Sequence, residues 1–365
     1  MSKALNMKVK GTVYNIPTPS SLSYMWNFGS LLGVMLMIQV ISGILLSFQY
    51  SSSLVEAFES VLNTMDDTSL GWLIRSIHAN GASFFFICVF LHIARGMYHG
   101  SWGFPGVWLS GVTILFVLMG TAFMGYVLPW GQMSLWGATV ITNLLSALPY
   151  IGGELVEWVW GGFSVSSPTL TRFTSIHFLL PIGLVGLVGT HVLLLHFEGS
   201  SNPLGLGLNS DKVFFHPYFT SKDVWGMMVL GLVLVTVSVE SYDQFMDPDN
   251  FSEANPMVTP PHIQPEWYFL FAYSILRSIP SKMGGVIALV MSIACLALLP
   301  LFKWVKVGKM SSRFSTTRKV GILIYFISFI LLTWIGSKPV EGIYPLAGKI
   351  MSIIYFISLG VMMIN

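Results

Sequence analysis

Long apolar stretches alternate with polar and charged segments along the whole chain of 365 residues. A helix needs about 17–25 predominantly apolar residues to cross a bilayer, and all but one of these stretches reach that length. The fifth is short and needs its polar flanks to complete a span. Because every backbone polar group must be satisfied inside lipid, the pattern predicts an all-α integral membrane protein. The eight predicted transmembrane helices cover about residues 27–48, 71–98, 107–129, 175–197, 224–239, 284–302, 319–336 and 343–364.

Composition and charge support this interpretation and give the bundle an orientation. Hydrophobic residues make up 54% of the chain and charged residues only 9%, which is typical of an integral membrane protein. If the N-terminus lies inside, 12 of the 18 Lys and Arg residues fall on the inner side and 13 of the 16 Asp and Glu residues on the outer side. This bias predicts an inner N-terminus. The basic segment of residues 1–20 has no apolar run and is expected at the inner surface.

Two of the predicted spans carry a pair of histidines. His78 and His92 lie 14 residues apart on the second span, and His177 and His191 repeat this spacing on the fourth. At ~100° and ~1.5 Å per residue, this spacing returns to nearly the same helix face about 21 Å further along. Both helices run from outside to inside, so His78 meets His177 at an outer level and His92 meets His191 at an inner level. A lone membrane histidine is usually a core or proton-path residue, but two matched pairs predict ligands.

Glycines repeat the same spacing on the first and third spans. Gly29 and Gly43 lie 14 residues apart, as do Gly111 and Gly125, so that two glycines fall at each histidine level. Glycine often helps membrane helices to pack, but it also lets a flat ligand approach the backbone closely. Two facing imidazoles suit the axial positions of a b-type haem, and filled axial positions indicate electron transfer. The first four spans therefore predict a four-helix di-haem bundle.

Several charged residues near these levels leave two interpretations open. Arg75 and Arg95 lie three residues outside and inside their histidines, where they would neutralise haem propionates or reach the membrane surface. His196 and Asp223 would form a proton-donating pair beside the inner level or belong to a solvated loop. Glu266 opens a short apolar helix after a long acidic outer loop. It would accept a proton or interact with the helix dipole.

Longer motifs give the chain a specific resemblance. They are WNFGSLLG (26–33), HANGASFFF (78–86), GYVLPWGQMSLWGATVITNLLSALPYIG (125–152), DPDNF (247–251) and PPHIQPEWYFLFAYSILRSIP (260–280). Together with the four histidines, these motifs resemble the mitochondrial cytochrome b family, the haem-bearing membrane subunits of ubiquinol:cytochrome c reductase, respiratory complex III. The resemblance covers nearly the whole chain.

The resemblance implies two b-type haems. His78 and His177 would ligate the outer, lower-potential haem, and His92 and His191 the inner, higher-potential haem. Quinol would be oxidised at an outer site, and the resulting electron transfer would be coupled to proton translocation. One electron would pass to a Rieske iron–sulfur protein and then to cytochrome c1. The other would cross the two haems to reduce ubiquinone or a related quinone at an inner site.

Residue roles at the quinone sites also follow from the resemblance. Glu266 and Tyr126 would take part in quinol binding and proton release at the outer site. The inner site would be formed by Asn27, His196, Ser200, Lys222 and Asp223. The four glycines and both arginines would surround the haems.

The resemblance further implies a domain division, a location and an assembly. Residues 1–200 would form the haem-binding bundle, and residues 201–365 would complete the quinone sites. The chain would lie in the mitochondrial inner membrane, among lipid, with both termini on the matrix side and within a homodimeric complex.

Two other classes of protein compete with this interpretation. A proton-coupled secondary transporter would use the histidines and Glu266 as a relay and would bind no haem. A dehydrogenase anchor subunit would keep the haems, but the PEWY stretch at residues 265–268 and the eighth span argue against it. The basic loop at residues 303–319 is interpreted as a topology signal and lipid contact, so no nucleic-acid partner is expected.

Overall fold

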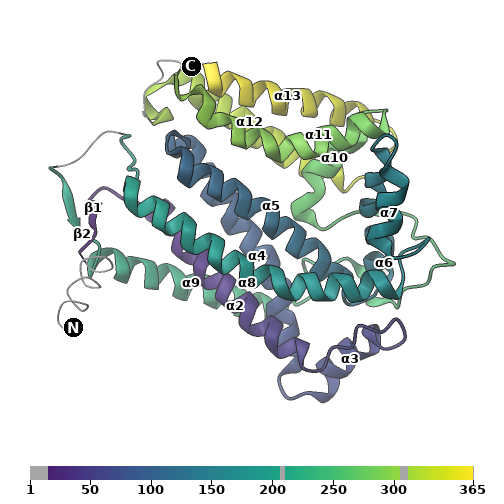
Figure 1. The fold of residues 1–365 in the computed structure, drawn as a ribbon. Helices are drawn as coiled ribbons and strands as arrows, with labels where there is room; N and C mark the ends of the chain where they lie inside the picture. The colour runs from purple at the N-terminus through teal and green to yellow at the C-terminus, as the bar shows by residue number, and fades with distance from the viewer. Residues whose placement is uncertain (1–14, 206–209, 305–310, 365) are drawn as a thin grey trace.

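Helices make up almost all of the structure (Figure 1). The computed structural model describes residues 15–205, 210–304 and 311–364. In this part of the chain there are twelve α-helices, α2 to α13, and two short strands, which confirms the predicted all-α fold class. The expected surface position of the N-terminal segment falls mostly on residues 1–14 and thus outside the described residues.

Eight of these helices are long and apolar enough to cross a membrane, which confirms the predicted number of spans. One of them, α11, continues into the 3-10 helix η6 (Cys295–Trp304). The eight are α2 (Phe28–Ser47), α4 (Gly71–Tyr98), α5 (Pro105–Val127), α8 (Ser167–Glu198), α9 (Tyr218–Glu240), α11 (Lys282–Ala294), α12 (Thr316–Gly336) and α13 (Tyr344–Ile364).

Polar ends make two of the spans longer than their apolar runs predict. α8 begins earlier, at Ser167, because Ser166 and Thr169 form a capping box in front of it. α9 begins earlier, at Tyr218, so the short fifth span becomes a helix of 23 residues. An apolar run marks only the part of a helix that lies in lipid, and these polar ends extend beyond it.

The first four spans form the bundle that positions the histidines. α5 packs along α8, α2 packs along α4, and α2 also contacts α8, while α9 lies against α2 and α4 (Figure 1). The two helices with histidines therefore alternate with the two helices that carry the spaced glycines.

The C-terminal helices form a second group beside this bundle (Figure 1). α10 (Leu270–Ser278) packs on α11, α12 and α13, and α12 packs along α13. Buried apolar side chains form one continuous core across both groups, including Phe86 from α4, Ile275 from α10 and Tyr355 from α13. The short helix α10 thus links the C-terminal spans to the histidine bundle.

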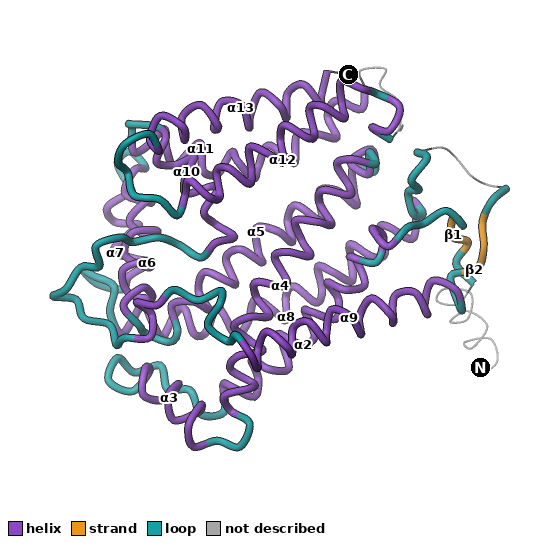
Figure 2. Tube along the Cα trace, turned by 180° about the vertical axis from the view of Figure 1, so that it is seen from behind, coloured by secondary structure: helices purple, strands orange, loops and turns teal. Residues whose placement is uncertain are grey.

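Short elements cover the two ends of the bundle (Figure 2). α3 (Ala57–Asp67), α6 (Gln132–Thr142) and α7 (Gly152–Trp160) lie at one end, where the outer loops were predicted. At the other end β1 (Pro17–Pro19) pairs antiparallel with β2 (Lys212–Phe214), a pairing that the sequence did not predict. The remaining 3-10 helices are η1 (Tyr24–Trp26), η2 (Ser101–Gly103), η3 (Asn143–Ala147), η4 (Pro248–Phe251), η5 (Trp267–Phe269) and η7 (Ser312–Phe314).

Candidate functional site

The bundle brings the four histidines together in two pairs. The ring centroids of His78 and His177 are 6.4 Å apart, and those of His92 and His191 are also 6.4 Å apart. Two imidazoles on opposite sides of one metal ion, bonded at about 2 Å, place their ring centres about 6 Å apart once ring radii of about 1 Å are added. Each pair therefore has the separation of two axial ligands of one metal.

Neighbouring groups fix the tautomer of three of these histidines. His177 donates from Nδ1 to the Thr121 carbonyl at 2.8 Å. Ser42 Oγ lies 2.8 Å from Nδ1 of His78, and Ser110 Oγ lies 2.8 Å from Nδ1 of His191. Each serine hydroxyl donates its own hydrogen bond to a backbone carbonyl. The serines therefore accept from Nδ1–H, which leaves the Nε2 lone pair free for a metal.

The glycines of the two other helices lie directly against the histidines. A Cβ on Gly29 would be 3.7 Å from Cε1 of His92, one on Gly43 3.0 Å from that of His78, and one on Gly111 3.2 Å from that of His191. A Cβ on Gly125 would overlap the ring of His177. Each of these four glycines thus faces the histidine of its own predicted level, and the absence of a side chain lets the ring lie close to the backbone.

Unpaired donors mark the inner histidine level. Arg95 donates from Nη2 to His92 Nδ1 at 3.2 Å, and its guanidinium lies 5.3 Å from the centre of the Trp26 ring. In the part of the chain that the structure describes, Arg95 Nε and Trp26 Nε1 are buried without hydrogen-bond partners. Buried donors in lipid need an acceptor, and a carboxylate such as a haem propionate fits them.

The donor set at each level suits a macrocyclic cofactor better than a bare ion. Among the described residues, no group of three or more His, Cys, Asp or Glu side chains is placed to hold a metal. Each level therefore offers two neutral nitrogens only, and a haem supplies the remaining four ligands from its own ring. The paired histidines, the glycines against them and the unpaired donors all fit a b-type haem.

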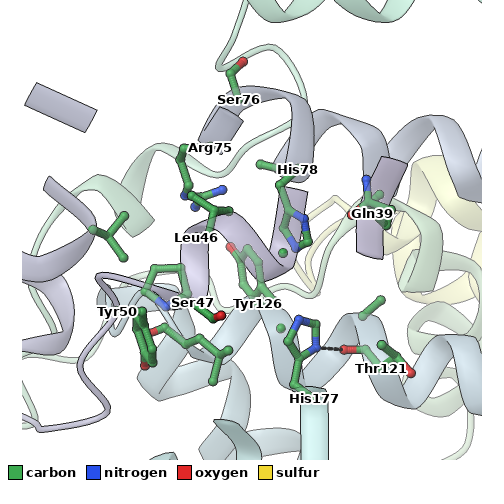
Figure 3. Close-up of a pocket in the computed structure, with 18 of the residues that line it drawn as sticks. Gln39, Leu46, Ser47, Tyr50, Arg75, Ser76, His78, Thr121, Tyr126 and His177 are labelled. Carbon is green, nitrogen blue, oxygen red and sulfur yellow. Dashed lines mark hydrogen bonds between the residues drawn. The ribbon is translucent and has the colours of Figure 1, made fainter. Parts of the chain in front are cut away.

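A large cavity surrounds the outer histidine pair (Figure 3). Its volume of about 340 Å³ lies within the range of about 300–1,000 Å³ that is usual for ligand sites. His78, His177, Arg75 and Tyr126 all line it, and Glu266 lies on its wall. The cavity thus joins the outer histidine level to the predicted quinol residues.

Glu266 is a titratable group on the wall of this cavity. It occupies the N-cap position of η5, the short helix immediately before α10, without a capping hydrogen bond from its side chain. Burial raises the pKa of its carboxyl group to about 7, while a hydrogen bond from Tyr126 opposes part of that rise. A carboxyl group with a pKa near neutrality can take up and release a proton at physiological pH.

Contacts with α4 hold the segment that carries Glu266. Trp267 donates from Nε1 to Ser83 Oγ at 3.0 Å, and the Tyr268 ring stacks on Phe86 with centroids 4.1 Å apart and planes 5° apart. The two residues after Glu266 are therefore fixed on the helix that also carries His78.

The predicted inner quinone residues are only partly brought together. Asn27 donates to the Lys222 carbonyl at 3.0 Å, and Lys222 Nζ donates to the Leu22 carbonyl at 2.7 Å. Asp223 is next to Lys222 in α9. His196 is exposed and, in the described part of the chain, hydrogen-bonds to none of these groups. The structure thus joins the N-terminal end of α2 to α9.

The residues that orient the histidines were not predicted from the sequence. Ser42 and Ser110 each precede a spaced glycine, so that the dipeptide Ser-Gly recurs at 42–43 and 110–111. This repeated Ser-Gly dipeptide could have identified both serines from the sequence. Thr121 acts through its backbone carbonyl, which no residue type reveals.

These features define an integral membrane bundle whose paired histidines lie at two levels and suit planar metal cofactors. Family comparison agrees with this class. Residues 13–199 match the family model described as cytochrome b/b6/petB, and residues 253–356 match that described as cytochrome b(C-terminal)/b6/petD. The chain belongs to the cytochrome b family and has the electron-transfer role of that family.

A solved structure described as a hyperthermophilic respiratory Complex III is similar over nearly the full length. The chains are 34% identical, the TM-score is 0.92, and the match covers 98% of this chain and 95% of that chain. The resemblance seen in the sequence motifs is therefore confirmed.

Proposed function

We propose that the chain is the cytochrome b subunit of a ubiquinol:cytochrome c reductase. Quinol oxidation at the outer level and quinone reduction at the inner level would be joined by electron transfer between the two histidine pairs, with net proton translocation. The observation that carries this proposal is the pair of 6.4 Å histidine separations, one at each level. Similarity to a solved respiratory Complex III supports the assignment to that complex.

Each histidine pair would hold one b-type haem. Bound haems would supply reversible one-electron chemistry at two depths, which divides a path across about 30 Å of hydrocarbon. His78 and His177 would serve the outer haem, and His92 and His191 the inner one. The glycines would admit the ring edges, and Arg75 and Arg95 would neutralise the propionates.

The outer cavity is suited to quinol oxidation because it contains an acid with a near-neutral pKa. Glu266 would accept a proton from a quinol hydroxyl at a carboxylate oxygen, and Tyr126 would hydrogen-bond to the carboxylate and to the substrate. The burial that raises the pKa of Glu266 also keeps bulk water from the reacting oxygen. The contacts of Trp267 and Tyr268 with α4 would hold the carboxyl group at a fixed height.

The inner quinone site would lie where α2 and α9 meet. Its proposed members are Asn27, His196, Ser200, Lys222 and Asp223. Their contacts support this in part, because the Asn27 side chain already reaches the Lys222 backbone. The exposed His196 would turn toward the site only when quinone is bound, and Asp223 would supply its proton. Residues 1–200 would thus bind the haems, while residues 201–365 would complete both quinone sites.

The proposed assembly is a homodimeric complex with a Rieske iron–sulfur protein and cytochrome c1, in the mitochondrial inner membrane with both termini on the matrix side. In an apolar stretch of 18 residues in each helix, only 6% of the residues of α8 and 11% of those of α9 are buried within the chain. Helices so little covered by their own chain have faces free for lipid or for a second subunit.

A redox titration of the purified membrane complex, followed by the reduced-minus-oxidised b-type absorbance, tests the proposal. Two components with different potentials in a one-to-one ratio are expected. A single component would mean that only one histidine pair binds haem. No haem signal would overturn the proposal and favour a proton-coupled transporter.

A further inference from the structure

One face of α10 is fixed to the C-terminal end of α12. Leu270, Tyr273 and Arg277 follow one another at spacings of three and four residues, so they lie on the same face. At one end of this face the backbones meet, since a Cβ on Gly336 would overlap the Leu270 carbonyl. α10 therefore has little freedom to slide along α12 at its N-terminal end.

Arg277 fixes the other end of the same face. Its Nη2 donates to the carbonyls of Ile335 at 2.8 Å and Gly336 at 3.2 Å, and its Nη1 donates to the carbonyl of Lys338 at 3.0 Å. The last carbonyls of a helix have no partner within the helix and carry its negative dipole end. A guanidinium with two forked nitrogens is well suited to bind them together.

A second contact of Arg277 reaches the segment that bears Glu266. The guanidinium lies 4.8 Å from the centre of the Tyr273 ring, and Tyr273 Oη donates to the Ile263 carbonyl at 3.1 Å. Ile263 comes three residues before Glu266 in the chain. The end of α12, Arg277, Tyr273 and the backbone before Glu266 thus form one connected series of contacts.

We propose that Arg277 is a positioning residue for quinol oxidation, which fixes α10 and, through Tyr273, the height of Glu266 in the outer cavity. α4 holds the same segment from the other side, through Trp267 and Tyr268. Arg277 itself does not line the cavity, so its effect on the substrate is indirect. This inference rests on the proposed function of the outer site.

Two substitutions in the assembled complex test the role of Arg277. Arg277→Met removes the three hydrogen bonds to backbone carbonyls and the charge but keeps an unbranched side chain. Arg277→Lys keeps the charge without the forked guanidinium. A misplacement of about 1 Å can reduce a rate by roughly 100-fold. We expect Arg277→Met to slow quinol oxidation at least tenfold per outer haem, with Arg277→Lys between it and the wild type. Electron exchange between quinone and the inner haem, measured separately from outer-site turnover, should keep its wild-type rate.

The pH profile separates positioning from a general loss of stability. If Glu266 moves toward water, its pKa falls toward the ordinary carboxyl range, so quinol oxidation in Arg277→Met should begin to rise at lower pH than in the wild type. Arg172→Met is the matched control, because Arg172 donates to the carbonyls of Trp158 and Val159 at the end of α7, far from α10 in sequence. It should keep the wild-type profile.

Results other than these would contradict either the positioning role of Arg277 or the proposed function. Equal losses at the outer and inner sites, with an unchanged pH profile, would overturn the positioning role and leave Arg277 a structural residue. If Arg277→Met does not assemble with haem, Tyr273→Phe is the deciding variant, since it keeps the ring and removes the hydroxyl that bonds to the Ile263 carbonyl. An unchanged pH profile in that variant would overturn the proposal. A wild-type complex that does not oxidise quinol would overturn the proposed function instead.

Discussion

At the scale of single residues, a histidine can serve a metal only through the ring nitrogen that its neighbours leave free. His177 uses Nδ1 on the Thr121 carbonyl, and the serine hydroxyls engage Nδ1 of His78 and His191. His92 differs, because Arg95 donates to its Nδ1. If a haem propionate drew Arg95 away, Nδ1 of His92 could carry the ring proton and Nε2 would be free for the metal, so the fourth ligand and the arginine are coupled.

The level assignment predicts selective loss of one haem. His92→Leu removes an inner ligand and leaves His78 and His177 intact, so the inner b-type component should disappear while the outer one persists. His177→Leu is the converse variant and should remove the outer component. Redox titration of each assembled variant measures both. Loss of only the lower-potential component in His92→Leu would contradict the assignment.

The raised pKa of Glu266 predicts how quinol oxidation depends on pH. The residue accepts a proton only as a carboxylate, and its pKa of about 7 means that this form increases as pH rises through neutrality. The rate should therefore rise from about pH 6 to pH 8 in the wild type. Glu266→Gln, which cannot ionise, should be slower by roughly 100-fold and lose this rise, while both haems remain. Steady-state turnover and haem spectra across this range provide the measurement, and an unchanged rate would remove Glu266 from the mechanism.

At the scale of elements, the sites depend on how closely a glycine-bearing helix approaches a histidine-bearing one. α5 lies along α8, and the close approach of Gly125 to His177 leaves no room for a methyl group. On the same helix, a Cβ on Gly120 would meet nothing within 4 Å. A methyl group therefore fits at Gly120 but not at Gly125.

This difference predicts the outcome of two alanine substitutions. Gly125→Ala should push the His177 ring out of place, and the outer haem should fall well below one per inner haem. Gly120→Ala should keep the one-to-one ratio, since the methyl group enters open space. Haem content by redox spectroscopy of the purified complexes distinguishes them. Equal ratios in both would show that the ring tolerates the methyl group.

The sequence predicted elements well wherever a periodic pattern reports on the environment. The eight spans follow from apolar length, and the opposed glycine and histidine levels follow from a spacing of 14 residues. The small sheet of β1 and β2 escaped because three-residue strands of Pro, Thr, Lys, Val and Phe carry no alternation. The contact of Arg277 with the end of α12 joins residues about 60 positions apart through backbone carbonyls. Because every residue type has the same backbone carbonyl, the sequence does not reveal this contact.

Across the molecule, the two groups of helices contribute different parts of the candidate site. The first four spans carry the histidines and glycines, while α10 to α13 hold the segment with Glu266 against α4. The contact between the groups is therefore where the outer histidine pair meets Glu266. Chain order alone does not predict this arrangement, because residues 263–270 belong to the C-terminal half but pack against the N-terminal bundle.

The same arrangement makes the cofactors part of the stability of the bundle. Without haem, the cavity around the outer histidine pair and the unpaired donors of Arg95 and Trp26 remain uncompensated inside the membrane region. A ligand that binds only the folded state stabilises it by about 4 kcal/mol at a thousand times its Kd. Protein produced under haem limitation should therefore have a Tm several degrees lower than the loaded complex, and added haem should restore it. The double variant His78→Leu, His92→Leu provides the control and should not respond to haem. A haem-limited wild type that also fails to respond would show that the bundle is stable with its cavities unfilled, and the cofactors would then serve electron transfer alone.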